Sequence, residues 1–248
     1  AGCAEHDGNQ ANTVTLCRRN ETVSGFIRMA GLEAIDRWIA PQQRIAIILL
    51  DVVEREFLDR VPLVVLGKLL DQGALSDQPD AITTGVAIGT DALYDRVVRE
   101  DRIRFAPVTH THAISTLAAL PRFKAINSCI EVDLFGQANA EFIKGRQVSG
   151  TGGLVDFLRG AREAKDGRGI LALASTAKQG KISRIVPRLS PDATSISRAD
   201  VDTVVTEHGI AELKHKTLEQ RAEALIAIAD PAFQDHLAQQ WVEIRKGL

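Results

Sequence analysis

An apolar run that leads through a glycine-dense turn into an amphipathic helix constrains the fold of this 248-residue chain most strongly. Residues 125–134 are mostly apolar and predict a buried strand, with Glu131 and Asp133 on its opposite face at a spacing of two. The turn at 150–153 follows, and a helix is predicted from Leu154. The strand therefore ends beside polar groups and a flexible loop.

The turn contains Gly150, Gly152 and Gly153, so its backbone N–H groups can approach a ligand closely. The positive end of the following helix adds to this, and the turn predicts a cradle for an oxyanion or a phosphate. A dinucleotide-binding fingerprint is excluded because Val155 stands where a third glycine is needed. The alternative is a tight strand-to-helix connection. Gly167 marks a surface turn after the helix, where a larger side chain should matter less.

The rest of the chain alternates strands and helices. Expected strands cover 82–88, 103–110, 169–174, 182–186 and 202–206, and expected helices cover 92–99, 115–120, 154–164, 217–228 and a last segment from Pro231. Thr217 with Gln220 forms a capping box. This alternation predicts an α/β fold with an open, mostly parallel sheet flanked by helices.

Composition excludes several classes of protein. Thirty basic and 32 acidic residues leave a net charge of −2, and aromatic residues make up 4%, so a nucleic-acid-binding surface is not expected. No run of 18 apolar residues occurs, so no membrane span is expected. Three unpaired cysteines predict reduced thiols in a cytoplasmic protein, with Cys129 as a small core residue.

Several further motifs occur in a fixed order. They read Ala-Ser-Thr-Ala-Lys at 174–178, Ser-Arg-Ile-Val-Pro at 183–187, Thr-Ser at 194–195 and Asp-Thr-Val-Val-Thr-Glu-His-Gly-Ile-Ala-Glu-Leu at 202–213. Together with 127–157, they make the chain resemble the C-terminal domain of the acetyl-CoA hydrolase/4-hydroxybutyrate CoA-transferase family. The resemblance predicts that 81–248 is this domain. Residues 1–80 are then an atypical helical or irregular segment, either a remnant of the first CoA-transferase domain or a segment of different origin.

The resemblance implies a class I CoA-transferase fold, with the active site between two related α/β domains. The implied reaction transfers CoA between an acyl-CoA and a short-chain carboxylate through a glutamyl-CoA thioester, with acyl-CoA hydrolysis as a side or main reaction. Coenzyme A is then a substrate, and no metal or prosthetic group is expected. The alternative is a catalytically silent CoA-binding or subunit-interface domain. The partner of this domain is then either another copy of the chain, in a homo-oligomer, or a missing N-terminal domain, and both alternatives stay open.

The resemblance also assigns residues. Gly152 and Gly153 become the oxyanion loop, and Lys178 becomes a contact for the CoA nucleotide, the alternative being a solvated surface lysine. His112 takes the place of an asparagine that polarises the thioester carbonyl in many members of the family.

The nucleophilic glutamate is not recognisable, because its motif is missing upstream of residue 69. Glu56, Asp59 and Glu131 are weak candidates. For Glu131 we expect instead that its carboxylate orders the neighbouring glycine loop through N–H hydrogen bonds.

Two other chemistries are disfavoured. His110 and His112 would lie on one side of the strand expected at 103–110, but a third metal ligand at a suitable spacing is missing. Glu207 and His208 resemble an acid and base pair, yet they follow a buried strand and are expected to be positional.

Overall fold

The computed structural model of the chain describes residues 12–17, 44–49, 82–85 and 91–248. Glu56 and Asp59, two of the weak candidates for the nucleophile, lie outside these residues.

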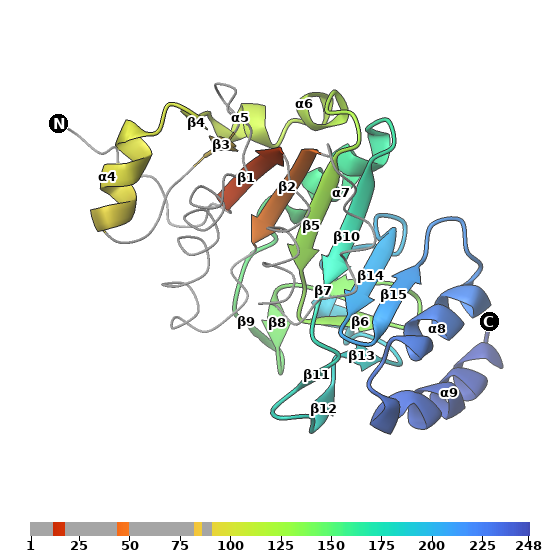
Figure 1. Cartoon of the computed structure of the whole chain (residues 1–248). Coiled ribbons are helices and arrows are strands. Elements are labelled where there is room, and N and C mark those ends of the chain that lie inside the picture. The colour runs from red at the N-terminus through yellow and green to blue at the C-terminus, as the bar shows by residue number, and fades with distance from the viewer. Residues whose placement is uncertain (1–11, 18–43, 50–81, 86–90) are drawn as a thin grey trace.

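A six-stranded sheet forms the centre of the molecule, in the order β1-β2-β5-β10-β14-β15 (Figure 1). The strands are β1 Asn12–Cys17, β2 Arg44–Leu49, β5 Lys124–Ser128, β10 Arg168–Ala172, β14 Thr203–Thr206 and β15 Gly209–Glu212. The four central strands are parallel, and each outer strand pairs antiparallel with its neighbour. The expected open, mostly parallel sheet is therefore confirmed.

Two of these strands come from the segment before residue 81. β2 pairs with β5 so that Ile47 lies opposite Ile126, and β1 pairs with β2. The expectation of helical or irregular structure in 1–80 is thus wrong at 12–17 and 44–49, because these segments complete the sheet. The division of the chain at residue 80 stays a prediction.

Helix α7, Leu154–Glu163, lies beside the sheet and buries Leu154, Phe157, Leu158 and Ala161. Leu158 packs so closely on β10 that a Cβ at Gly169 would meet its side chain at 2.9 Å. α6, Ile114–Ala118, packs on α7 where Leu117 meets Gly160. The branched and aromatic side chains of α7 thus form one core layer with β5 and β10.

The remaining helices flank the sheet at its two ends (Figure 1). They are α4 Asp91–Arg99, α8 Leu218–Ala227 and α9 Pro231–Arg245. The capping box at Thr217 and Gln220 is confirmed, since each side chain bonds the backbone N–H of the other residue. Among the described helices, none is both long and apolar enough to cross a membrane.

The strand expected at 103–110 is wrong beyond Phe105. β4 covers Ile103–Phe105 and pairs with β3, Ile82–Thr84, after which α5 runs over Val108–Thr111. Pro107 explains the change, since its fixed φ suits a helix start and it offers no N–H to a ladder. His110 and His112 therefore do not share a strand face.

The single strand expected at 125–134 is two strands in different sheets. β5 ends at Ser128, and β6, Glu131–Asp133, lies between β13 and β7 in a three-stranded sheet. Arg184 fixes the break, because its guanidinium donates to the carbonyls of Cys129 (2.7 Å) and Ile130 (2.6 Å). A local apolar pattern cannot show a partner that lies 54 residues away.

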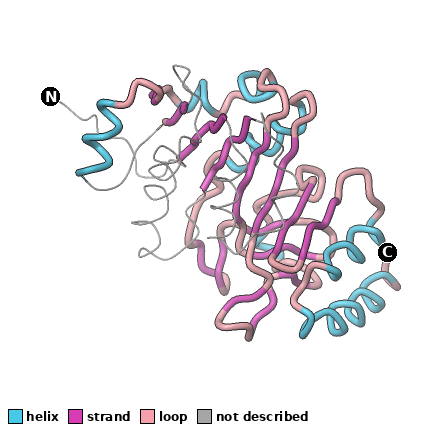
Figure 2. Tube along the Cα trace, in the orientation of Figure 1, coloured by secondary structure: helices cyan, strands magenta, loops and turns pink. Residues whose placement is uncertain are grey.

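Short ribbons gather at the end of the sheet near β6 (Figure 2). They are β7 Ala138–Asn139, β8 Phe142–Ile143, β9 Arg146–Gln147, β11 Thr176–Ala177, β12 Ile182–Ser183 and β13 Ile185–Val186, with the 3-10 turn η2 at Pro191–Ala193. The strand expected at 182–186 is therefore divided between β12 and β13, while β14 turns back into the unexpected strand β15.

Candidate functional site

The carboxyl ends of the parallel strands share one edge of the sheet, and the short ribbons lie at that edge (Figure 1). In open α/β sheets ligands bind in the crevice outside this edge. β5 leads to Glu131, β10 leads to Ser175, and β14 leads to Glu207. The residues that follow these strands are therefore the first place to look for a site.

Gly153 and His112 are in direct contact. A Cβ built on Gly153 would overlap Cδ2 and Nε2 of the His112 ring, so no larger residue fits without moving the imidazole. Gly153 is the N-cap of α7 and is buried. The structure thus brings together two residues that the sequence assigned to one site, although they are 41 positions apart.

The glycine loop presents unused N–H groups. Within the described part of the chain, the N–H groups of Thr151, Gly152 and Gly153 donate to no protein acceptor. Gly152 has φ +49, which favours glycine, while Gly153 has φ −86 and is required for space. Free N–H groups at a helix start favour an anionic partner.

Gly167 was expected to tolerate larger side chains, and this is wrong. A Cβ there would overlap the carbonyl oxygen of Ala161 at the end of α7. The chain turns back so closely against the last turn of α7 that this position also has no space for a larger side chain.

His112 is held in place by two neighbours. Its Nδ1 lies 2.8 Å from Oγ1 of Thr111, and its ring meets the Phe157 ring edge-on at 4.9 Å between centroids. Burial lowers the pKa of His112 below its ordinary value of 6.5, and the nearby carboxylate of Asp156 opposes this only in part. The imidazole is therefore a neutral hydrogen-bonding group rather than a fixed cation.

Glu131 does not order the glycine loop as expected. Its Oε1 accepts a hydrogen bond of 2.9 Å from Nδ2 of Asn139 on the neighbouring strand β7. Asn139 is fully buried and also bonds the backbone of Glu141 and Phe142. The expectation failed because β6 pairs with β7 and not with the segment that leads to Gly150.

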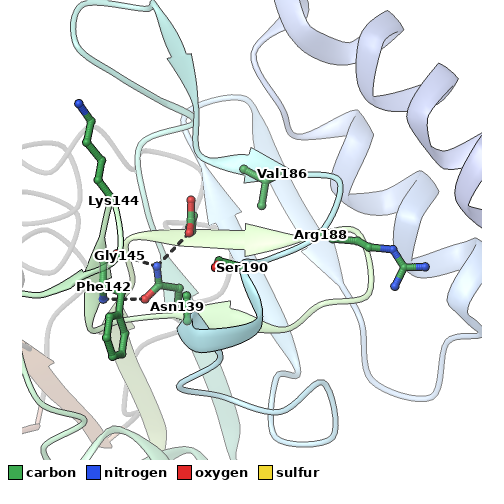
Figure 3. Close-up of a pocket in the computed structure, with 9 residues that line it drawn as sticks. Asn139, Phe142, Lys144, Gly145, Val186, Arg188 and Ser190 are labelled. Atoms are coloured by element: carbon green, nitrogen blue, oxygen red, sulfur yellow. Dashed lines mark hydrogen bonds between the residues drawn. The ribbon is translucent and has the colours of Figure 1, made fainter.

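A pocket of about 400 Å³ lies beside Glu131 and Asn139 (Figure 3). Its other walls come from the β8–β9 hairpin and from the segment after β13, at Phe142, Lys144, Gly145, Val186, Arg188, Ser190 and Ala193. Figure 3 shows that the side chains of Lys144 and Arg188 point away from Asn139. Sequence reasoning missed every wall residue except Glu131.

Asp133, which was paired with Glu131 in the sequence pattern, has a different role. It is 1% exposed and accepts hydrogen bonds from the N–H groups of Phe135, Gln137 and Leu189 and from the Gln137 side chain. A buried carboxylate with four donors stabilises the loops around the small sheet. It has no free face for a ligand.

Lys178 is exposed at the tip of the β11–β12 hairpin. Its φ of +50 and that of Gln179, +57, form a left-handed turn that ends at Gly180. The ammonium forms no ion pair with any residue that the structure describes. This position suits a phosphate contact at the edge of a site and equally suits a solvated lysine.

Ser175 and Glu207 link the ends of β10 and β14. The Ser175 hydroxyl donates to Oε1 of Glu207 at 2.6 Å, and its N–H donates to Oε2 at 2.8 Å. Partial burial acts to raise the pKa of Glu207, but these bonds, its own N–H and the nearby His208 leave the pKa below its ordinary value. Glu207 is thus ionised, and its hydrogen bonds to Ser175 hold the ends of β10 and β14 together.

His208 lies between two carboxylates. Its Nε2 is 3.8 Å from Oε1 of Glu207 and 3.7 Å from Oδ2 of Asp230, the N-cap of α9. Its N–H bonds Oγ1 of Thr206, whose hydroxyl donates to the carbonyl of Ile228. These contacts hold the β14–β15 turn against the α8–α9 loop.

In the described residues, no three side chains of histidine, cysteine, aspartate or glutamate gather as a metal site would require. The groups available at the carboxyl edge of the sheet are the N–H groups of the glycine loop, the neutral imidazole of His112 and the partly exposed carboxylate of Glu131.

The similarity of the chain to known proteins agrees with this geometry. The family model for the acetyl-CoA hydrolase/transferase C-terminal domain matches residues 89–241, more than half of the chain. The chain belongs to this acetyl-CoA hydrolase/transferase family. The matched region begins just before α4 and ends within α9, so it contains the glycine loop, His112 and the pocket.

Similar proteins carry CoA-transferase names. The chain is 43% identical to a 4-hydroxybutyrate coenzyme A transferase from Clostridium kluyveri, over 66% of this chain and 38% of that protein. It is 40% identical to a succinyl-CoA:cyclohexane-1-carboxylate CoA transferase from Geobacter metallireducens, over 69% and 40%. The chain spans about two fifths of the length of these curated relatives.

Solved structures show the same fold. A 4-hydroxybutyrate CoA-transferase from Porphyromonas gingivalis matches with a TM-score of 0.60 and 37% identity, over 74% of this chain and 43% of that one. RipA from Yersinia pestis matches with a TM-score of 0.65 and 30% identity, over 73% and 41%. The class I CoA-transferase-like α/β fold is therefore confirmed for the described domain.

Proposed function

We propose that this chain supplies the CoA-binding half of an enzyme that transfers CoA between an acyl-CoA and a short-chain carboxylate, with acyl-CoA hydrolysis as a side or main reaction. The contact between Gly153 and His112 carries the proposal. It places free N–H groups and a neutral imidazole at one point, where a thioester carbonyl oxygen would find donors on two sides.

The donors would act when charge develops. A glutamate carboxylate that attacks the thioester carbonyl converts the carbonyl oxygen into an oxyanion, and the N–H groups of Gly152 and Gly153 stabilise that charge. When Thr111 donates to Nδ1 of His112, the ring proton sits on Nε2, the atom that faces Gly153. The CoA thiolate leaves, and the acyl group is joined to the glutamate as a mixed anhydride. The thiolate then attacks the glutamyl carbonyl, which gives the glutamyl-CoA thioester and releases the acyl group as a carboxylate.

The nucleophile is not assigned to a described residue. Glu56 and Asp59 lie outside the described residues, and Glu131 is bonded to Asn139 in its own pocket. We propose that the attacking glutamate belongs to a part of the protein outside residues 91–248. A class I CoA-transferase reaction needs such a second domain facing the carboxyl edge of the sheet, and a homo-oligomer would be compatible with it. A cytoplasmic location and a CoA substrate without a metal or prosthetic group are parts of the same proposal.

Lys178 is proposed as the contact for the CoA nucleotide. An exposed ammonium on a hairpin tip can pair with a phosphate at the edge of the site. Replacement by alanine should weaken CoA binding by about 1 kcal/mol, roughly fivefold to tenfold in Kd.

Binding and exchange assays test the function. Titration calorimetry with CoA should give heat that Lys178→Ala and Gly153→Ala reduce. Mass spectrometry should show transfer of CoA from acetyl-CoA to labelled propionate, and hydroxylamine should trap the glutamyl-CoA thioester as a hydroxamate at a glutamate. Absence of heat at millimolar CoA together with absence of exchange would overturn the proposal.

A further inference from the structure

Thr111 and His112 are neighbours in the chain, and the hydrogen bonds of α5 hold the backbone of both. The N–H of Thr111 donates to the carbonyl of Pro107 at 3.0 Å. The N–H of His112 donates to the carbonyl of Val108 at 2.9 Å. The two side chains also meet, with Oγ1 of Thr111 2.8 Å from Nδ1 of His112. The imidazole therefore approaches the glycine loop with Nδ1 turned to Thr111 and with Cδ2 and Nε2 turned to Gly153.

The hydroxyl of Thr111 has one place to put its proton. Thr111 is 4% exposed, and within the described part of the chain Nδ1 of His112 is the only group that its Oγ1 bonds. If Nδ1 carried the ring proton, it would donate to Oγ1 and leave the hydroxyl proton unpaired in the protein interior, which costs free energy. The hydroxyl therefore donates, and Nδ1 accepts.

The proton of the imidazole is then on the nitrogen that faces the glycine loop. Burial lowers the pKa of His112, so the ring is neutral at neutral pH and carries a single N–H. Because Nδ1 acts as an acceptor, that proton is on Nε2. Nε2 has no hydrogen-bond partner among the residues that the structure describes. It is thus a free donor beside Gly153.

The position of this proton decides whether the ring attracts or repels a carbonyl oxygen. The N–H groups of Thr151, Gly152 and Gly153 likewise have no acceptor within the described ranges. A carbonyl oxygen or an oxyanion can only accept hydrogen bonds, so a proton on Nε2 adds one donor to those of the loop. In the other tautomer, the lone pair of Nε2 would face the same oxygen and repel it.

We propose that Thr111 is a positioning residue, whose buried hydroxyl holds His112 in the tautomer with the proton on Nε2 and so makes the ring a donor for the acyl oxygen of the substrate. The inference rests on the proposed function and deepens it, because it names the residue that sets the hydrogen-bonding polarity of the site. Thr111 acts only through His112, since its side chain is buried and its hydroxyl is used by Nδ1.

Nitrogen NMR on the whole, isotopically labelled chain reads the tautomer directly. The His112 signals are identified by their absence in His112→Asn. In the wild type at neutral pH, Nε2 should have the chemical shift of a protonated nitrogen and Nδ1 that of an unprotonated one. Thr111→Val keeps the shape of the side chain and removes the hydroxyl, so the two shifts should move toward each other as the proton exchanges between both nitrogens. Thr111→Ser should restore the wild-type shifts.

Calorimetry tests what the tautomer does for a ligand. Acetyl-CoA has a thioester carbonyl and CoA lacks one, so Thr111→Val should raise the Kd of acetyl-CoA about fivefold and leave the Kd of CoA unchanged. Thr116→Val on α6 is the matched control, because the Thr116 hydroxyl bonds nothing among the described residues. It should change neither Kd nor the His112 shifts. If thermal unfolding shows that Thr111→Val is not folded, Thr111→Ala, which also lacks the hydroxyl, replaces it.

The outcomes distinguish this inference from the proposed function. A proton on Nδ1 in the wild type, or His112 shifts and an acetyl-CoA Kd that loss of the Thr111 hydroxyl leaves unchanged, overturns the role of Thr111 and leaves the proposed function standing. Failure of the wild type to bind either CoA or acetyl-CoA overturns both. A proton on Nε2 that depends on the Thr111 hydroxyl, together with selective weakening of acetyl-CoA binding, supports the inference.

Discussion

The imidazole of His112 occupies the space that a side chain at position 153 would need. The N-terminus of α7 and the segment between α5 and α6 are therefore in contact through a glycine that has no Cβ. This contact positions the loop N–H groups, and its removal can be measured directly.

Gly153→Ala should destabilise the chain by about 1–3 kcal/mol, because the new methyl group forces the imidazole to move. His112→Ala removes the obstruction. The double variant should therefore lose less stability than the sum of the losses in the two single variants. Chemical denaturation of the four proteins measures this coupling. Gly247→Ala is the control, since its Cβ would meet only the Ile244 carbonyl oxygen at 3.7 Å. Simple additivity would contradict the contact.

His112 should make stability depend on pH. Its pKa is lowered in the folded chain by burial, so the unfolded chain binds more protons and stability falls as pH decreases below about 6.5. His112→Asn should lose less stability than the wild type between pH 7 and pH 5. Denaturation midpoints across this range provide the test, and equal slopes in the two proteins would argue against a buried neutral imidazole.

Asn127→Leu should stabilise the chain by about 1 kcal/mol. The Asn127 side chain on β5 is 1% exposed, and neither of its amide atoms has a partner in the part of the chain that the structure describes. Replacing an unsatisfied buried amide by an apolar group of similar volume removes its desolvation cost. The free energy of unfolding reports the change. A clear loss of stability would mean that the amide is hydrogen-bonded in solution.

Ser175→Ala should cost about 1 kcal/mol near neutral pH, since the Glu207 carboxylate loses a 2.6 Å hydrogen bond and is partly open to water. The pKa of Glu207 is lowered in the folded chain, so this contribution is present above about 4.5 and is lost as pH falls through the folded value. The gap between variant and wild type should narrow in acid. Ser183→Ala, whose hydroxyl bonds the neutral carbonyl of Ile185, should show a gap that does not depend on pH.

Cys129 should resist alkylation in the folded chain. Burial raises the pKa of its thiol to about 12, so almost no thiolate forms at pH 8. Peptide mapping after iodoacetamide treatment should find Cys129 unmodified in buffer and modified in denaturant. Rapid labelling of the native chain would show that β5 opens readily at its carboxyl end.

The alternation of apolar segments was enough to predict the parallel sheet, α7 and the last two helices, because these elements depend on periodic side chains within their own length. The capping box at Thr217 is equally local. The glycine loop and His112 were assigned to one site from the sequence by resemblance to a family, and their role stays a prediction; their contact is what the structure adds. Cys129 was expected in the core and is buried there.

Contacts between distant residues decided the rest. The apolar run at 125–134 changes sheets because Arg184 takes the carbonyls that would have continued β5, and Pro107 turns an expected strand into α5. Glu131 faces Asn139 and a pocket rather than the glycine loop because β6 pairs with β7. Spacing along the chain determined which segments fold as strands and helices. Only the tertiary structure decided which side chains meet, since hydrogen bonds and steric contacts join residues that no sequence period relates.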